Sequence, residues 1–177
     1  MTTALLIIDV QRALCAGEYA AFDIARVIER INGLSARARS AGLPVVLVQH
    51  EEGDGPLQHD TAGWQLADDL ATHDGDLRLR KTTPDAFFRT GLHALLQQKG
   101  VERVIVCGLQ SEFCVDTTVR SALAQGYHVV LAEDAHSTCD NGVLSAAQIS
   151  AHHNATLRYL TSFGPSVTLT PAADVAV

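Results

Sequence analysis

Residues 4–9 read Ala4-Leu5-Leu6-Ile7-Ile8-Asp9, an unbroken apolar run that ends on a charge. A strand with one face in water alternates apolar and polar residues, whereas a strand covered on both faces is apolar throughout. The run therefore predicts a strand in the middle of a parallel sheet. Two later runs, Val104-Ile105-Val106-Cys107 and Val129-Val130-Leu131-Ala132, predict further strands of this kind, which Gly108 and Glu133-Asp134 are expected to end.

Helical spacing separates these strands. Apolar residues recur three and four positions apart from Ile24 to Ala38, which predicts a helix that closes near Gly42. The other predicted elements are strands at 45–49, 77–79 and 166–169 and helices at 92–98, 115–126 and 144–159. Apolar strands that alternate with helices are typical of a parallel sheet covered on both faces. We predict a single domain, residues 1–177, with a three-layer α/β/α fold around a Rossmann-like, mostly parallel six-stranded sheet.

The composition excludes several classes of function. Of the 177 residues, 47% are apolar and 19% are charged, which suits a packed core and argues against disorder. The net charge of −7 gives no broad attraction to nucleic acid or to an anionic membrane. No apolar stretch reaches the roughly 18 residues of a membrane span, and no basic residue precedes the first apolar run as in a signal peptide. We expect a cytoplasmic protein that binds neither nucleic acid nor membrane.

The four cysteines, Cys15, Cys107, Cys114 and Cys139, form no close pair, which argues against a zinc knuckle or a disulfide framework. Most of them are expected to be small buried hydrophobes in a reducing compartment. Cys114 differs, because it follows a predicted strand by a short turn and opens a helix. A helix N-terminus lowers the pKa of a thiol and so favours the nucleophilic thiolate. Cys114 is therefore a candidate nucleophile, with a buried structural cysteine as the alternative.

Three chemically active segments follow predicted strand ends: Asp9, Lys81 and the stretch from Gly108 to Cys114. Ligands of parallel α/β sheets bind beyond the carboxyl ends of the strands. There a carboxylate can take the thiol proton, an ammonium can keep the carboxylate ionised, and a thiolate can attack a carbonyl carbon. Each residue also has a structural alternative: Asp9 as a helix cap or surface ion pair, and Lys81 as a solvated member of the basic run 77–81.

Three segments, Ala4 to Gln11, Lys81 to Phe88 and Gly108 to Thr118, resemble signature segments of the isochorismatase-like hydrolases. That superfamily of cysteine hydrolases includes nicotinamidases and N-carbamoylsarcosine amidohydrolases. The similarity runs from Thr3 to about Leu160, with the motifs in the family's order. Each motif alone is weak, but the set is specific.

The resemblance implies a catalytic triad of Asp9, Lys81 and Cys114 and a non-proline cis peptide bond at Leu109–Gln110. It also implies that backbone N–H groups of Gln110 and Cys114 bind the oxyanion that forms during acyl transfer. In the implied cycle, Asp9 takes the thiol proton, the thiolate attacks an amide-type carbonyl, and water later cleaves the thioester. A homodimer or homotetramer is implied as well.

A metal site is where this chain departs from the nicotinamidases, which bind zinc through an Asp-x-His pair after the second strand and a later His. The corresponding stretch here lacks that pair, and its candidate ligands are His50, Glu52 and His59. These residues lie in or beside an irregular loop, 51–63, that contains three glycines. We therefore predict no metal and no cofactor. The departure also argues against nicotinamide as the substrate, because in the nicotinamidases the metal holds the pyridine nitrogen.

Several residues near the motifs are candidates for a substrate pocket. Trp64, Phe87 and Phe113 can line an apolar cavity, although any one aromatic is more often core. The remaining pocket candidates are Gln11 and Leu109, and Asp134 and His136 are expected near the rim because they follow the next strand.

Two other functions compete with amide hydrolysis. Cys114 and Arg120 satisfy the Cys-x5-Arg pattern of cysteine phosphatases, but the residues between them are mostly β-branched, lack glycine and keep helical spacing. Such a phosphatase needs a loop whose N–H groups surround a phosphate, so this alternative is disfavoured. The second alternative is a catalytically idle member that binds a ligand or partner, which the intact Asp9, Lys81 and Cys114 argue against.

Overall fold

Six parallel strands form one sheet in the computed structural model, which describes residues 1–177. In spatial order they are β3 (Leu77–Lys81), β2 (Val45–His50), β1 (Thr3–Ile8), β4 (Arg103–Leu109), β5 (His128–Ser137) and β6 (Val167–Thr170). From β1 the chain winds first toward β3 and then, from β4, toward β6. The winding reverses between β1 and β4. In such sheets ligands bind at the carboxyl ends of the strands at this point, a position called the crevice below.

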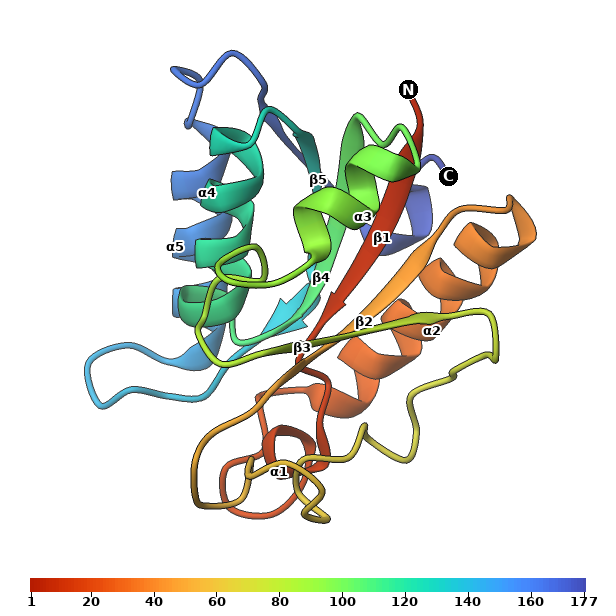
Figure 1. The fold of residues 1–177 in the computed structure, drawn as a ribbon. Helices are drawn as coiled ribbons and strands as arrows, with labels where there is room; N and C mark the ends of the chain where they lie inside the picture. Colours follow the sequence, from red (N-terminus) through yellow and green to blue (C-terminus); the bar gives the residue numbers. More distant parts are fainter.

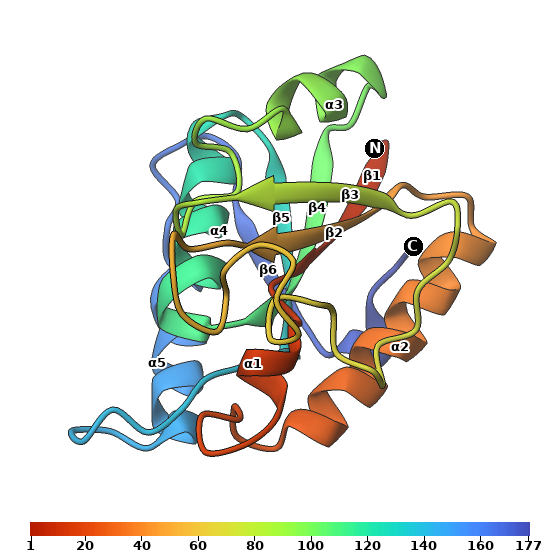
Figure 2. The same ribbon diagram turned by 60° about the horizontal axis from the view of Figure 1, so that its bottom comes forward.

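Helices cover both faces of the sheet (Figures 1 and 2). The elements are α1 (Arg12–Cys15), α2 (Ile24–Ser40), α3 (Leu92–Gln98), η1 (Ser111–Val115), α4 (Asp116–Ala124), α5 (Ala146–Arg158) and η2 (Ala172–Asp174). On one face α2 and η2 pack on side chains such as Leu5 and Ile7, and on the other α3, α4 and α5 pack on Leu6 and Ile8. The predicted three-layer α/β/α fold is confirmed, and the sheet is parallel throughout.

The burial of the strands explains the sequence pattern that predicted them. All six residues of β1 are buried, as a strand covered on both faces requires. The edge strand β3 instead alternates half-buried Leu77 and Leu79 with exposed Arg78 and Arg80. None of the helices has the length and apolar character needed to cross a membrane.

The predicted end of β4 at Gly108 is wrong, because the strand continues to Leu109. Gly108 has a φ of +116° and pairs with Ile8, and a Cβ atom there would lie 2.1 Å from the Ile8 carbonyl oxygen. Glycine is thus required by the close approach of β1 and β4 rather than as a strand breaker.

The predicted end of β5 at Glu133-Asp134 is also wrong, because β5 runs on to Ser137 past an irregularity in its pairing with β4. The Asp134 carboxylate accepts a 2.7 Å hydrogen bond from the Ala172 N–H and pairs with Arg30 at 3.3 Å. Its charge is therefore accommodated at the strand. The helix predicted at 144–159 is observed as α5, and Ser145 and Gln148 form a capping box at its start.

Candidate active site

The carboxyl ends of four elements bring the polar residues of the crevice together. Asp9 follows β1, His50 ends β2, Lys81 ends β3, and Cys114 lies in η1 just beyond β4. The strand register aligns these ends, since Ile8 pairs with both Val48 and Gly108. Residues more than 100 positions apart therefore meet at one edge of the sheet.

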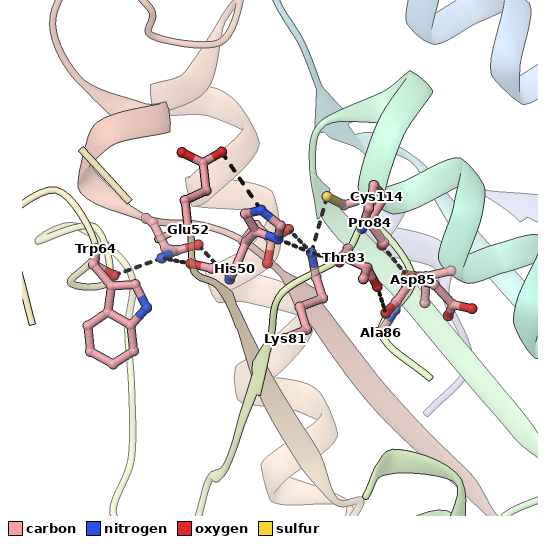
Figure 3. Close-up of polar contacts among 12 residues, drawn as sticks. His50, Glu52, Trp64, Lys81, Thr83, Pro84, Asp85, Ala86 and Cys114 are labelled. Carbon is pink, nitrogen blue, oxygen red and sulfur yellow. Dashed lines mark hydrogen bonds and ion pairs between the residues drawn. The ribbon is translucent and has the colours of Figure 1, made fainter. Parts of the chain in front are cut away.

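The Lys81 ammonium lies at the centre of this group. Its Nζ is 2.6 Å from Asp9 Oδ2, and it donates hydrogen bonds of 3.1 Å to Cys114 Sγ and 3.1 Å to the Thr83 carbonyl oxygen (Figure 3 shows the Cys114 and Thr83 contacts). The side chains of Asp9 and Lys81 are 0% exposed. The structure therefore places Asp9, Lys81 and Cys114 in direct contact around one buried cation.

The free oxygen of Asp9 gives the site a proton acceptor. Oδ2 pairs with Lys81, but Oδ1 is buried and has no hydrogen-bond partner. A buried carboxylate oxygen without a donor is costly, and such atoms are common where a substrate or a transferred proton completes the set.

The environment of Cys114 corrects the expectation of a lowered thiol pKa. Burial, followed by the negative charge of Asp9, raises the pKa of Cys114 to about 12 against the opposing effect of Lys81. Cys114 is also the fourth residue of η1, not the first, so the helix terminus does not dominate. A pKa raised in this way keeps the resting sulfur protonated, as a thiol, at neutral pH.

The turn that carries Cys114 is fixed by residues from other elements. The Leu109–Gln110 peptide bond is cis, as the resemblance implied. Behind the turn, the Ser111 hydroxyl and His136 Nδ1 lie 2.7 Å apart, and His136 Nε2 lies 2.8 Å from Asn154 Oδ1. His136 is buried and lies behind η1 rather than at the rim expected for it.

Sequence reasoning missed the contacts of His136 with Ser111 and Asn154, because these residues are 25 and 18 positions from His136 in the chain. Asn154 Nδ2 donates to the Glu133 carbonyl oxygen, which leaves Oδ1 as the acceptor of the His136 Nε2–H. His136 Nδ1 then accepts from Ser111. The network holds η1 against β5 and α5.

Two of the expected pocket residues have packing roles in place of the predicted substrate contact. The Gln11 amide donates to the carbonyl oxygens of His50 and Trp64 and accepts from the His50 N–H, so no amide hydrogen is left for a ligand. Phe87 is buried in the core, where its ring stacks on Tyr127 at 5.8 Å.

The other pocket candidates differ in exposure. Leu109 is fully buried, whereas Phe113 is 54% exposed on η1. Trp64 is 9% exposed, its ring meets the His59 ring at 4.6 Å, and its indole Nε1 has no hydrogen-bond partner. Phe113, next to Cys114 in the chain, is thus the aromatic candidate whose side chain is largely exposed, whereas Trp64 is buried.

The three metal candidates do not form a common ligand set. His59 pairs with Asp60 at 3.2 Å, and Glu52 Oε1 is 3.9 Å from His50 Nε2. The donor atoms of His50, Asp9 and Cys114 do lie within 4.8 Å of one another. However, the Lys81 ammonium lies 3.2 Å from His50 Nδ1 and already contacts the other two, so the position of a metal is taken by a fixed cation.

Arg120 is not positioned for phosphate chemistry. Its guanidinium donates to both oxygens of Asp116, at 2.6 and 3.1 Å, and Asp116 also contacts His153 Nδ1 at 3.0 Å. This bidentate pair within α4 occupies N–H donors of the guanidinium that a phosphate would need, and the contact of Asp116 with His153 ties α4 to α5. The geometry therefore disfavours the phosphatase alternative.

Comparisons with known proteins agree with this fold. A family model for the isochorismatase domain matches residues 3–170. A crystal structure of an isochorismatase family protein is 36% identical, with a TM-score of 0.87 over 96% of this chain and 98% of that one. The chain belongs to the isochorismatase family, as its sequence motifs predicted.

Two curated relatives are hydrolases. The chain is 45% identical to a streptothricin hydrolase of Streptomyces noursei over 138 residues, which are 77% of this chain and 50% of that protein. It is 30% identical to the ureidoacrylate amidohydrolase RutB of Caulobacter vibrioides over 171 residues, 76% of each chain. The chain thus spans about half the length of the streptothricin hydrolases that it matches.

Proposed function

We propose that the protein is a cysteine hydrolase that cleaves a small amide or a related non-peptide C–N bond, with Asp9, Lys81 and Cys114 as its catalytic residues. The observation that carries the proposal is the buried Lys81 ammonium, which contacts both the Asp9 carboxylate and the Cys114 sulfur. The names of the relatives, streptothricin hydrolase and ureidoacrylate amidohydrolase, support the same class of reaction.

The first half of the cycle makes the thioester. Asp9 Oδ1 takes the proton as the Cys114 S–H bond breaks, and the sulfur forms a bond to the carbonyl carbon of the substrate. The carbonyl electron pair moves to oxygen, where the N–H groups of Gln110 and Cys114 bind the resulting oxyanion. Preorganised donors of this kind are each worth about 3 kcal/mol. As the C–N bond breaks, Asp9 returns its proton to the departing amine or ammonia.

The second half releases the acid product. Asp9 takes a proton from water, the hydroxyl attacks the thioester carbon, and the C–S bond breaks. Asp9 then returns the proton to sulfur, which restores the thiol. Lys81 keeps Asp9 ionised between proton transfers and stabilises the thiolate, and neither half needs a metal or a nucleotide cofactor.

The test is a panel of small amides, ureides and lactams in which release of ammonia or amine is measured. Cys114→Ala protein serves as the blank, and a thermal melt checks that the variant is folded. We expect at least one substrate whose hydrolysis disappears in the variant. Hydrolysis that survives in Cys114→Ala would refute the assignment of the nucleophile.

An idle, ligand-binding member of the family is the competing proposal. Slow alkylation of Cys114 at neutral pH cannot support it, because the raised thiol pKa makes Cys114 react slowly in either case. Binding of panel compounds without any turnover, at several pH values, would favour it. The intact contacts of Asp9, Lys81 and Cys114 support the enzyme instead.

Three further points remain proposals drawn from the sequence: that the 177 residues work as one domain, that the protein is cytoplasmic, and that it forms a homodimer or homotetramer. Sedimentation at several concentrations tests the last of these. A monomer at all concentrations would contradict it.

A further inference from the structure

His50 contacts the centre of the site but has no role in the proposed cycle. His50 and Lys81 are paired neighbours on the parallel strands β2 and β3, and His50 Nδ1 lies 3.2 Å from Lys81 Nζ (Figure 3). The His50 side chain is 15% exposed. Gln11 holds its backbone from both sides, through hydrogen bonds of 2.9 Å to the N–H and to the carbonyl oxygen.

The Lys81 ammonium has more acceptor atoms around it than it has N–H groups to donate. An ammonium has three N–H donors. Four acceptor atoms lie around Nζ: Asp9 Oδ2 at 2.6 Å, Thr83 O at 3.1 Å, Cys114 Sγ at 3.1 Å and His50 Nδ1 at 3.2 Å. The carboxylate and the backbone carbonyl are strong acceptors in every step. The imidazole nitrogen and the sulfur therefore compete as acceptors for the third N–H of Lys81.

Which of these two atoms accepts the third N–H depends on the protonation state of Cys114. A thiol sulfur is a weak acceptor, whereas an imidazole lone pair is a good one. Burial and then the charge of Lys81 lower the pKa of His50, against the opposing effects of Asp9, Glu52 and the Thr83 backbone, which favours a neutral ring. The tautomer that the proposal requires has its lone pair on Nδ1 toward Lys81 and its proton on Nε2, on the side of Glu52. A thiolate, in contrast, is charged and attracts the hydrogen more strongly than a neutral imidazole.

We propose that His50 is a positioning residue that holds the third N–H of Lys81 while Cys114 is a thiol and releases it to the sulfur when the thiol proton passes to Asp9. The switch needs no other reactant. The S–H bond of Cys114 breaks, an O–H bond forms on Asp9, and one N–H of Lys81 moves its hydrogen bond from His50 Nδ1 to Cys114 Sγ. His50 thereby keeps the resting cysteine protonated without taking a proton itself. The inference rests on the proposed roles of Asp9 and Cys114.

The experiment measures alkylation of Cys114 by iodoacetamide as a function of pH, without substrate. Peptide mass spectrometry separates Cys114 from the other free cysteines, Cys15, Cys107 and Cys139. The groups that face Cys114 are Asp9, Lys81 and His50, with Glu52 beyond His50, and His50 is the one that is varied. His50→Leu removes the acceptor, and His50→Gln replaces it by an amide oxygen. Glu52→Gln is the control for the charge next to the ring.

In His50→Leu the third N–H of Lys81 has no acceptor except the sulfur. We expect the alkylation midpoint to fall by about one pH unit, so that alkylation on the slope is about tenfold faster than in the unaltered protein. His50→Gln is expected to restore most of the original midpoint. A general loosening of the site would give no such rescue by the amide.

Equal midpoints in the unaltered, Leu and Gln proteins, or a higher midpoint in His50→Leu, would overturn the proposal. If His50→Leu does not fold, as judged by circular dichroism, His50→Met provides a second side chain without a strong acceptor. Because no substrate is used, the result is independent of whether the panel finds a hydrolysed amide. The failure of one proposal is thus distinguishable from the failure of the other.

Discussion

Asp9 has two opposite effects on Cys114, and they can be separated by one substitution. Its charge raises the pKa of the thiol, which suppresses the free thiolate, yet in the proposed cycle its Oδ1 is the base that makes the thiolate when substrate is bound. A thiol whose pKa is raised stays protonated until the pH exceeds that raised value. The site therefore depends on proton transfer within the complex rather than on a standing thiolate.

We predict that Asp9→Asn lowers hydrolysis by about 10²–10⁴-fold, the usual contribution of a general base. The same change removes the negative charge that raises the pKa of Cys114, so alkylation of Cys114 at pH 8 becomes faster. Both are measured on one preparation, by amine release and by peptide mass spectrometry. Unchanged turnover, or slower alkylation, would contradict the role given to Asp9.

Lys81 and Asp9 are expected to be strongly coupled in stability. Lys81→Met leaves a fully buried carboxylate without its cation, which typically destabilises a protein by about 3–5 kcal/mol. Adding Asp9→Asn removes the uncompensated charge and is expected to recover much of that loss. Urea unfolding of the two single variants and the double variant measures the coupling. A double variant no more stable than Lys81→Met would show that the pair is not desolvated.

At the scale of elements, the His136 network fixes the turn η1 through its neutral imidazole. Burial lowers the pKa of His136, an effect that its contact with Asn154 opposes. A histidine with a lowered folded-state pKa binds its proton more readily when unfolded. Its contribution to stability is therefore full above the unfolded pKa of about 6.5 and is lost as the pH falls through that value toward the lower folded pKa.

We predict that the unaltered protein loses stability relative to His136→Gln between about pH 8 and pH 5. Ser111 and Asn154 are unchanged in that comparison, as are the nearby charges of Asp134 and His153. Urea unfolding at several pH values gives the difference. A difference that does not vary with pH would indicate that His136 is not the titrating group.

The order of elements was predictable, but their ends at the crevice were not. Apolar runs such as residues 4–8 mark strands covered on both faces. At Gly108 and Asp134 the local sequence indicates a strand end, whereas contacts with Ile8 and Arg30 let the strands continue. Such contacts join residues far apart in the chain, so no local pattern reveals them.

Local sequence patterns were also insufficient to predict the contacts within the candidate active site. Positions after strand ends, together with the family resemblance, identified Asp9, Lys81 and Cys114. The direction of the Cys114 pKa shift was missed because burial and the distance to Asp9 are tertiary properties. The contact of His50 with Lys81 depends on the pairing of β2 with β3. Sequence reasoning therefore treated His50 as a loop or pocket residue, with a metal ligand as the weaker alternative.

In the whole molecule, the site lies where the winding of the sheet reverses, and both chain termini lie at the other end of the strands (Figure 1). The two-sided core fixes β1 and β4 rigidly, since their residues are almost fully buried. Rigid strands hold Asp9 and the turn that carries Cys114 within hydrogen-bond distance of the Lys81 ammonium. Such preorganisation is what a hydrolase needs to stabilise charge as it develops.

The most direct test of the account is to look for the acyl group on sulfur. A panel amide that is hydrolysed is mixed with the protein, the reaction is stopped with acid within the first turnovers, and the peptides are weighed. The account predicts that the acyl mass is found on the peptide containing Cys114 and disappears as product forms, and that Cys114→Ala shows neither label nor turnover. Turnover without any label on Cys114 in the unaltered protein, together with turnover in Cys114→Ala, would contradict it.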